Sequence, residues 1–155
     1  MAIQRAACWL TLRGIKLDPA HVSSVLSMQP DSTTIAGQQR FNQRTGQSSR
    51  PFPDSTWSVE SERHVAGNNL DDHFCWLMSS FDPANLPRIS NLESVWLTVF
   101  IDGDHDYEGF SLDRPVVEFA AALRAEVHVY CSLLCPTCDE AEVEGGISCE
   151  HSKRE

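Results

Sequence analysis

The chain has 155 residues, of which 41% are hydrophobic and 22% are charged, as expected for one globular domain with its own hydrophobic core. Its net charge of −10 and its pI near 4.9 argue against nucleic-acid binding as the main activity, because that affinity relies on Lys and Arg at phosphates. No stretch resembles a signal peptide or reaches the roughly 20 apolar residues of a membrane span, so a cytoplasmic protein without a membrane partner is expected.

The first expected elements are a strand and a short helix. Residues 8–13 place Cys8, Leu10 and Leu12 on one face and end at Gly14, which is the pattern of a β-strand. Asp18 then caps a helix that has proline as its first residue and that is expected to stop before Pro30.

Residues 31–54 lack apolar periodicity and are rich in Gln, Ser, Arg, Gly and Pro, which predicts a long polar loop. Arg40, Arg44 and Arg50 make this loop locally basic. Two interpretations stay open: a loop that grips a ligand or a partner, and a solvated insertion.

A second strand is expected at residues 56–61, with Trp57 and Val59 facing inward. A helix capped by Asn69 follows, and its apolar stripe consists of Leu70, Phe74, Leu77, Met78 and Phe81. His73 lies beside this stripe and is expected at the boundary of the apolar face, with a catalytic role as the alternative.

Residues 94–101 predict a central strand with two different faces. One face is aliphatic, and the other carries Trp96 and Phe100. Gly103 and its acidic neighbours predict a hairpin turn, and residues 107–112 predict the returning strand. The aliphatic face consists of Val95, Leu97, Val99 and Ile101.

The last expected elements are a helix and a strand. Asp113 caps a helix whose apolar positions are Val116, Phe119, Ala120 and Leu123. Residues 126–133 then predict a strand whose alternation buries Val127, Val129, Cys131 and Leu133.

The element order β-α-β-α-β-β-α-β predicts an α+β two-layer sandwich of ferredoxin-like kind, with a mostly antiparallel sheet and helices on one face. The domain is expected to comprise residues 1–134, followed by an acidic, cysteine-containing tail at residues 135–155.

Several landmarks occur in a distinctive order along the chain. They are Arg13-Gly14, Leu17-Asp18-Pro19, Trp57-Ser58-Val59-Glu60-Ser61, Leu70-Asp71-Asp72-His73, Trp76-Leu77 and Gly109-Phe110-Ser111-Leu112. In this order they resemble a bacterial family, domain of unknown function 4279, over roughly residues 7 to 131. The resemblance implies a small α+β domain without established catalytic residues, and some members look like immunity proteins of toxin systems. The acidic hairpin and the tail after Cys131 depart from the family pattern.

The tail contains a possible zinc site. Cys135 and Cys138 form a Cys-x2-Cys pair, and Cys149 with His151 would complete a tetrahedral Cys3His set. The intervening segment is acidic and the second pair lacks the usual spacing, so incidental cysteines in an acidic tail, or a redox pair of Cys135 and Cys138, are the alternatives.

The acidic hairpin offers oxygen ligands for Ca²⁺ or Mg²⁺ from Asp102, Asp104 and Asp106, next to His105. The run departs from a calcium loop, because Tyr107 stands where a glycine is required, and a solvated hairpin tip is the simpler interpretation.

The chain lacks the nucleophile, phosphate-loop and zinc-protease motifs, which favours a protein that is not an enzyme. Metal-assisted hydrolysis with His105 or His73 is the residual enzymatic alternative.

The leading hypothesis is a module that binds a basic partner protein, such as a toxin, through an acidic surface. The runner-up is a metal-binding or small-ligand-binding domain that uses the tail thiols or the arginine-bearing loop. The acidic surface consists of Asp102, Asp104, Asp106 and Glu108.

Overall fold

The long strands form a single five-stranded sheet with the order β2-β5-β1-β6-β7 in the computed structural model, which describes residues 3–41, 44, 46–103 and 111–133. The strands are β1 (Ile3–Gly14), β2 (Ser32–Thr34), β3 (Arg40–Phe41), β4 (Ser48–Ser49), β5 (Ser55–Glu60), β6 (Ser94–Gly103) and β7 (Glu126–Leu133). The helices are α1 (Pro19–Leu26), α2 (Leu70–Ser80) and α3 (Arg114–Leu123), with 3-10 turns η1 (Ser61–Arg63) and η2 (Pro83–Arg88).

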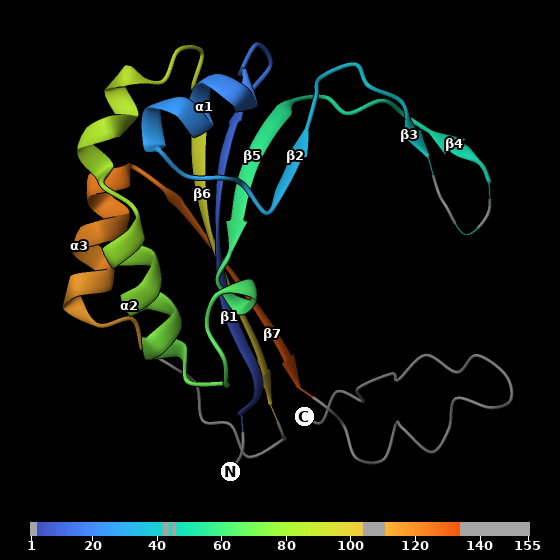
Figure 1. Cartoon of the computed structure of the whole chain (residues 1–155). Helices are drawn as coiled ribbons and strands as arrows, with labels where there is room; N and C mark the ends of the chain where they lie inside the picture. Colours follow the sequence, from blue (N-terminus) through green and yellow to red (C-terminus); the bar gives the residue numbers. More distant parts are fainter. Residues whose placement is uncertain (1–2, 42–43, 45, 104–110, 134–155) are drawn as a thin grey trace, which may run out of the picture.

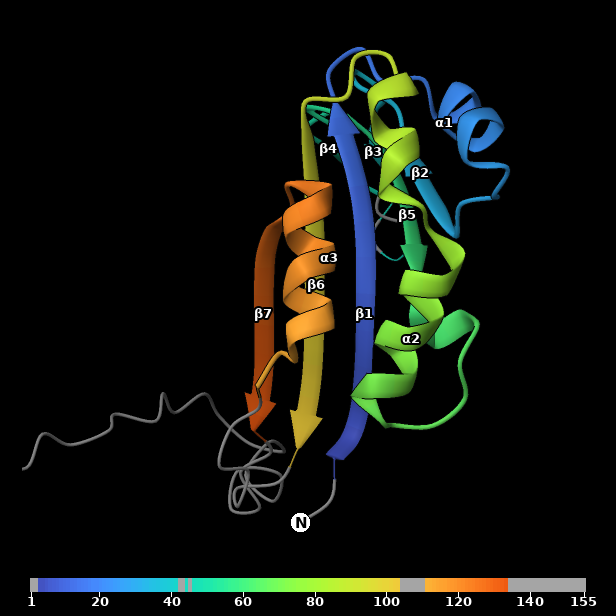
Figure 2. The same cartoon turned by 90° about the vertical axis from the view of Figure 1, so that its left-hand side faces the viewer.

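The sheet is mostly antiparallel and its helices cover one face, which confirms the α+β two-layer prediction. β1 lies in the middle and pairs antiparallel with both β5 and β6, and β2 pairs antiparallel with β5. Figures 1 and 2 show α1, α2 and α3 together on one side of this sheet. No helix in the described ranges has the length and hydropathy needed to span a membrane.

The connection that follows β6 differs from the predicted hairpin. β6 pairs with β7 in parallel, and α3 forms the crossover between them. Of the predicted return strand, Ser111 and Leu112 belong to no strand, and residues 107–110 lie outside the described ranges. The strand at residues 94–101 is therefore interior, but the middle strand of the sheet is β1.

The core lies between the sheet and the helices, and alternation predicted most of it correctly. Cys8, Leu10 and Leu12 of β1 are fully buried on the helix side, as are Trp57 and Val59 of β5. The aliphatic residues of β6 are buried next to them, and α2 and α3 contribute Phe74, Leu77, Phe81, Val116, Phe119, Ala120 and Leu123.

The prediction that alternation buries Val127, Val129 and Cys131 of β7 was wrong, and the predicted burial of Leu133 concerns a side chain that the structure does not describe. Val127 is 41% exposed and Val129 is 44% exposed, and Cys131 is exposed as well. Their register partners in β6 are buried, so these residues point toward the helix side of the sheet. They remain exposed because β7 is the edge strand and α3 lies over the adjacent strands instead (Figure 2). Alternation determines which face a side chain occupies, whereas burial depends on what covers that face.

The helix ends follow local chemistry. The side chains of Asp18 and Asn69 accept hydrogen bonds from Ala20 N and Asp71 N, as expected for N-caps. α1 ends at Leu26 because Ser27 adopts a left-handed conformation (φ 53°), so this helix stops before Pro30 acts on it.

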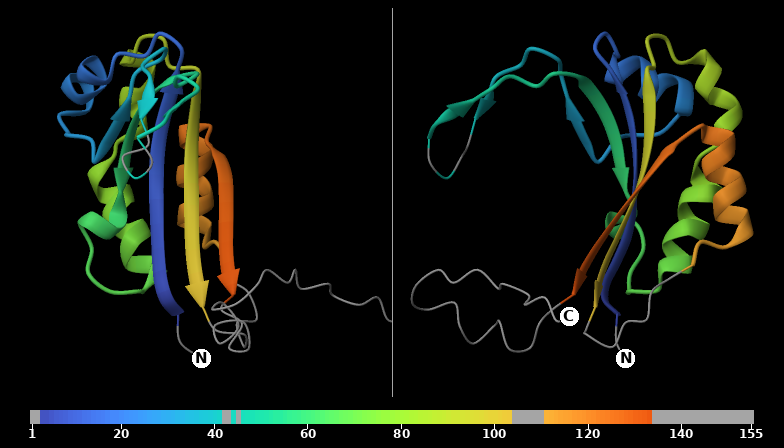
Figure 3. Two further views of the ribbon diagram at one scale, coloured as in Figure 1. Left: turned by 90° about the vertical axis from the view of Figure 1, so that its right-hand side faces the viewer. Right: turned by 180° about the vertical axis from the view of Figure 1, so that it is seen from behind.

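The sequence predicts a long loop over residues 31–54, and this prediction was wrong in part. The segment contains three short strands. β2 adds to the sheet beside β5, and β3 and β4 form a separate two-stranded ribbon. We call residues 35–54 the arm. Figure 3 shows that the arm extends away from the sheet on the side opposite the helices.

Candidate functional site

The face of the sheet that carries no helix is rich in aromatic and polar side chains. On β1 it presents Trp9, Thr11 and Arg13, which alternate with the buried residues Leu10 and Leu12. On β6 it presents the predicted aromatic face, with Trp96 opposite Thr11 and Thr98 opposite Trp9. Since the three helices lie on the other side, the arm is the described element that faces these side chains (Figures 1 and 3).

A cavity of about 390 Å³ lies where the arm leaves this face, within the size range of small-molecule sites. We call it the arm site. From β1, β2, β5, β6 and β7 it is lined by Trp9, Thr11, Arg13, Thr34, Thr56, Trp96, Thr98 and Tyr130. The arm contributes Arg40, Phe52, Pro53 and Asp54.

The base of the arm is tied to the sheet by polar contacts. Arg13 and Asp54 form an ion pair in which both side chains are about one-fifth exposed. The Thr34 hydroxyl donates to the Asp54 carbonyl at 3.2 Å, and the Oγ1 atoms of Thr34 and Thr56 lie 2.8 Å apart. These bonds fix the end of the arm that lines the cavity.

Two arginines stack on aromatic rings in the arm site, but their charges are balanced differently. The guanidinium of Arg13 lies 3.7 Å from the centroid of the Trp96 ring, and Asp54 compensates its charge. Arg40 lies 4.4 Å from the centroid of the Phe52 ring, and no described carboxylate pairs with it. Asp54 is the one acidic residue in the lining, so the site carries a net positive charge in a protein of net charge −10.

Two tryptophans line the site, and each packs against another ring. The indole N–H groups of Trp9 and Trp96 are buried and have no acceptor among the described residues. Trp9 stacks on Phe100, with the rings 5° from parallel and the centroids 6.4 Å apart, while Trp96 packs against His128.

The arm site includes one of the three arginines that the sequence singled out. Arg40 lines the cavity, whereas Arg44 and Arg50 are exposed and are not part of the lining. Of the three arginines, Arg40 is the one placed to contact a molecule in the arm site, and the prediction that this segment grips a ligand stays a prediction.

The predicted acidic surface falls mostly outside the described residues. Asp102 is half-buried on β6, four residues beyond Thr98. It does not line the arm site. The other members of the surface and of the cation site, Asp104, His105, Asp106 and Glu108, are not described. Their roles stay predictions.

The predicted zinc ligands are also outside the described ranges, namely Cys135, Cys138, Cys149 and His151. Within those ranges, no group of three or more His, Cys, Asp or Glu side chains is arranged to hold a metal ion.

His73 is buried and forms a polar chain with Ser61, so its predicted boundary position was wrong. His73 Nε2 lies 3.2 Å from the Gly67 carbonyl, which can only accept, and Nδ1 lies 2.8 Å from Ser61 Oγ. The Ser61 hydroxyl therefore donates to Nδ1, and its oxygen accepts from Cys8 N at 2.8 Å. The serine–histidine pair thus joins β1, η1 and α2. Because Ser61 has no exposed surface, a substrate cannot reach the pair.

Sequence reasoning missed most of the arm site. The available signal was the second face of β1 and β6, where Trp9, Arg13 and Trp96 occupy positions that a solvent-exposed sheet face would give to small polar residues. Asp54 and Phe52 carried no signal, because they approach the sheet only through the fold of the arm.

The comparisons with known proteins identify a family and no individual relative. Neither the search of curated proteins nor the search of solved structures gives a match. A family model described as "Domain of unknown function (DUF4279)" matches residues 3–133, which is most of the chain and includes every described element. The chain therefore belongs to the DUF4279 family.

Proposed function

We propose that this protein is a ligand-binding module and that the arm site holds a planar, negatively charged small molecule, such as an aromatic carboxylate. The observation that carries the proposal is Arg40, a cation without a described carboxylate partner at the rim of an aromatic cavity. The proposal develops the expectation of a small-ligand-binding domain that uses the arginine-bearing segment.

Charge selects the ligand class. A carboxylate that approaches the arm meets Arg40, and a charge-assisted hydrogen bond of this kind contributes about 1.5–3 kcal/mol. Asp54 does not cancel this attraction because its own negative charge is compensated by the ion pair with Arg13.

The floor favours a flat molecule with acceptor atoms. The rings of Trp9, Trp96 and Tyr130 supply aromatic surface in the lining, and four threonines supply hydroxyl groups. The buried Ser61–His73 pair offers no competing catalytic site within reach of solvent.

Titration with 2-naphthoate tests the proposal, with the neutral isostere 2-naphthalenemethanol as the comparison. Trp9 and Trp96 report directly, so the naphthoate should quench tryptophan fluorescence in a saturable way and the alcohol should bind at least roughly tenfold more weakly. Equal binding of both probes would show that charge does not select the ligand.

Two arginine variants locate the site. Arg40→Ala should weaken naphthoate binding by roughly tenfold or more, whereas Arg50→Ala removes the same charge from the same arm outside the cavity and should leave binding unchanged. Equal losses in both variants would indicate a general electrostatic effect and refute the assignment to the arm site.

A basic partner protein, such as a toxin, is a second candidate. It is favoured by the net charge of −10, and Asp102 is the described member of the predicted acidic surface. Proteins captured from the source cells at low salt should be lost at high salt and with Asp102→Asn. Capture that is insensitive to both changes would count against this surface.

A further inference from the structure

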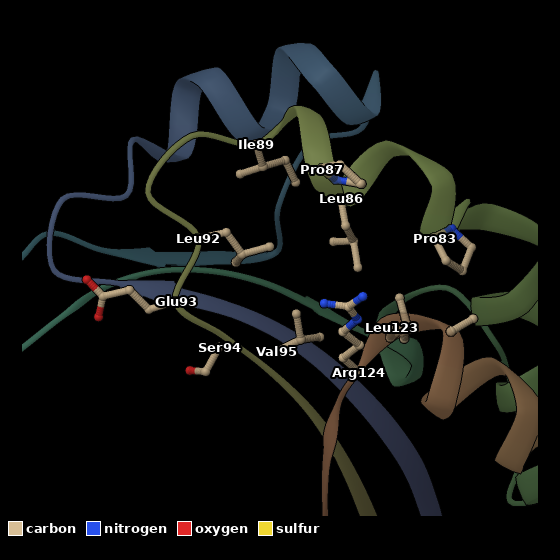
Figure 4. A pocket seen from close by; sticks show the side chains of 11 residues that line it. Pro83, Leu86, Pro87, Ile89, Leu92, Glu93, Ser94, Val95, Leu123 and Arg124 are labelled. Atoms are coloured by element: carbon tan, nitrogen blue, oxygen red, sulfur yellow. The ribbon is translucent and has the colours of Figure 1, made fainter.

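A second cavity lies on the opposite, helix-bearing face of the sheet. It has a volume of about 650 Å³ and is enclosed by η2, the segment leading into β6, and the C-terminal end of α3 (Figure 4). Its lining includes Leu86, Ile89, Leu92, Val95, Leu123 and Arg124, and we call it the Arg124 hollow. None of these residues belongs to the arm site.

The walls of the Arg124 hollow are aliphatic. Ile89, Val95 and Leu123 belong to the buried core and form its inner side, while Leu86 and Leu92 are half-buried and remain partly open to solvent. In Figure 4 the side chains of Leu86 and Leu92 point toward the same space as that of Val95. Such a surface favours a hydrocarbon chain, because each buried CH₂ group contributes about 0.8 kcal/mol in water-to-apolar transfer.

Arg124 is exposed and places one cation at the solvent side of these walls. Figure 4 shows its guanidinium between Leu86 and Val95, and no described residue forms a hydrogen bond or an ion pair with it. The one acidic residue in the lining, Glu93, points away at the other end of the hollow, where it accepts a bond from Ile15 N at 3.2 Å. The cation is therefore not neutralised within the cavity.

The backbone of Arg124 is in a conformation that normally selects glycine. It is the C-cap of α3 with φ 51°, and its N–H bonds to the carbonyls of Ala120 and Ala121. A side chain in the left-handed region carries a steric cost, so glycine is the usual residue at this kind of helix end. Glycine can therefore replace Arg124 without disturbing the end of α3.

We propose that the Arg124 hollow binds an amphipathic carboxylate, with the aliphatic chain against Leu86, Leu92 and Val95 and the carboxylate on the Arg124 guanidinium. The geometry supports this class because an unpaired cation and an apolar wall meet in one cavity of ligand size. This site is independent of the arm site, from which it is separated by the sheet.

Isothermal titration of the whole protein with sodium octanoate, and with 1-octanol as the neutral comparison, tests the chemistry of the site. Octanoate should bind at one site and octanol should bind at least roughly tenfold more weakly, since it lacks the charge that pairs with Arg124. Octanol binding as tight as octanoate binding would overturn the proposal and leave an apolar groove only.

The variant Arg124→Gly separates a ligand contact from a structural role. Glycine fits the left-handed backbone, so the thermal midpoint should stay equal or rise, while octanoate affinity should fall roughly tenfold or more. Arg124→Lys should retain part of the affinity because it keeps the charge. The control is Arg114→Ala at the other end of α3, which should leave octanoate binding unchanged.

Two further results would refute the site. Unchanged octanoate affinity in Arg124→Gly would show that the guanidinium does not bind the carboxylate. Loss of octanoate binding in Arg40→Ala, with Arg124→Gly unaffected, would assign the fatty carboxylate to the arm site instead.

Discussion

At the scale of single residues, Cys8 shows how burial changes chemistry. Its side chain lies in the core beneath α2, and burial raises the pKa of its thiol to about 12, with the hydrogen bond to Ser61 opposing the shift in part. The residue thus acts as a small apolar core residue whose backbone anchors Ser61 and, through it, His73.

The raised pKa of Cys8 makes stability depend on alkaline pH. The unfolded thiol ionises near its ordinary value of 9.0 while the folded thiol keeps its proton until about 12, so the unfolded state binds fewer protons in this window. The free energy of unfolding should therefore fall as pH rises from 9 toward 12, by up to about 1.4 kcal/mol per pH unit from this group.

Urea unfolding curves at neutral and alkaline pH measure this dependence. Because other groups also titrate there, the informative quantity is the difference from Cys8→Ala, which should lose stability less steeply with pH. Parallel pH profiles of the two proteins would show that the thiol does not contribute.

Gly14, at the end of β1, is required by a close approach of two chain segments. A Cβ atom there would collide with the backbone carbonyl oxygen of Asn91, which cannot move as a side-chain tip would. Gly14→Ala should therefore destabilise the protein by about 1–3 kcal/mol in urea unfolding. The adjacent Ile15→Ala, at an exposed position, should change stability by less than about 0.5 kcal/mol. Equal stabilities of the two variants would exclude the collision.

At the scale of elements, β6 and β7 show that two strands in register have different energetic roles. Val99 and Val129 are partners in the parallel pair and point toward the same face of the sheet. Val99 has no exposed surface, whereas Val129 is 44% exposed because it lies on the edge strand. The same residue type is thus a core residue in one strand and a surface residue in the next.

Truncation of each valine to alanine distinguishes the two environments. Val99→Ala leaves a cavity under α2 and α3 and should cost about 1–3 kcal/mol, whereas Val129→Ala should cost less than about 0.5 kcal/mol. Chemical denaturation gives both values. A similar loss in both variants would mean that β7 is covered in solution, for instance by association with another chain.

At the scale of the whole molecule, one sheet separates two cavities of different character. The helix side holds the aliphatic Arg124 hollow and the open side holds the aromatic arm site. Every buried core residue in the described ranges lies between Ala6 and Leu123, and the family match ends at residue 133. The fold thus draws its stability from the part of the chain that the family model matches.

A chain of residues 1–134 should therefore fold on its own. Its thermal midpoint, followed by circular dichroism, should lie within a few degrees of the full chain, because the deletion removes no described core residue. The full chain is the control. Loss of the cooperative transition would contradict the predicted domain boundary.

The local elements of this fold were predictable because their signals are local. The alternation in residues 8–13 and 94–101, the Asp18 and Asn69 caps and the stripes of α2 and α3 all reappear in the structure. The failures have a common cause, because the exposure of β7, the parallel β6–β7 pair and the burial of His73 depend on which elements become neighbours.

The sequence by itself determined the α+β class, the faces of the strands and the membership of a family, since periodicity and motif order are properties of the chain. Only the tertiary structure decided where the two cavities form. Arg13 meets Asp54 and Trp96, and Arg124 lines the same cavity as Leu86, across gaps in sequence that no local pattern encodes. The two sites exist because a single sheet brings distant segments together on each of its faces.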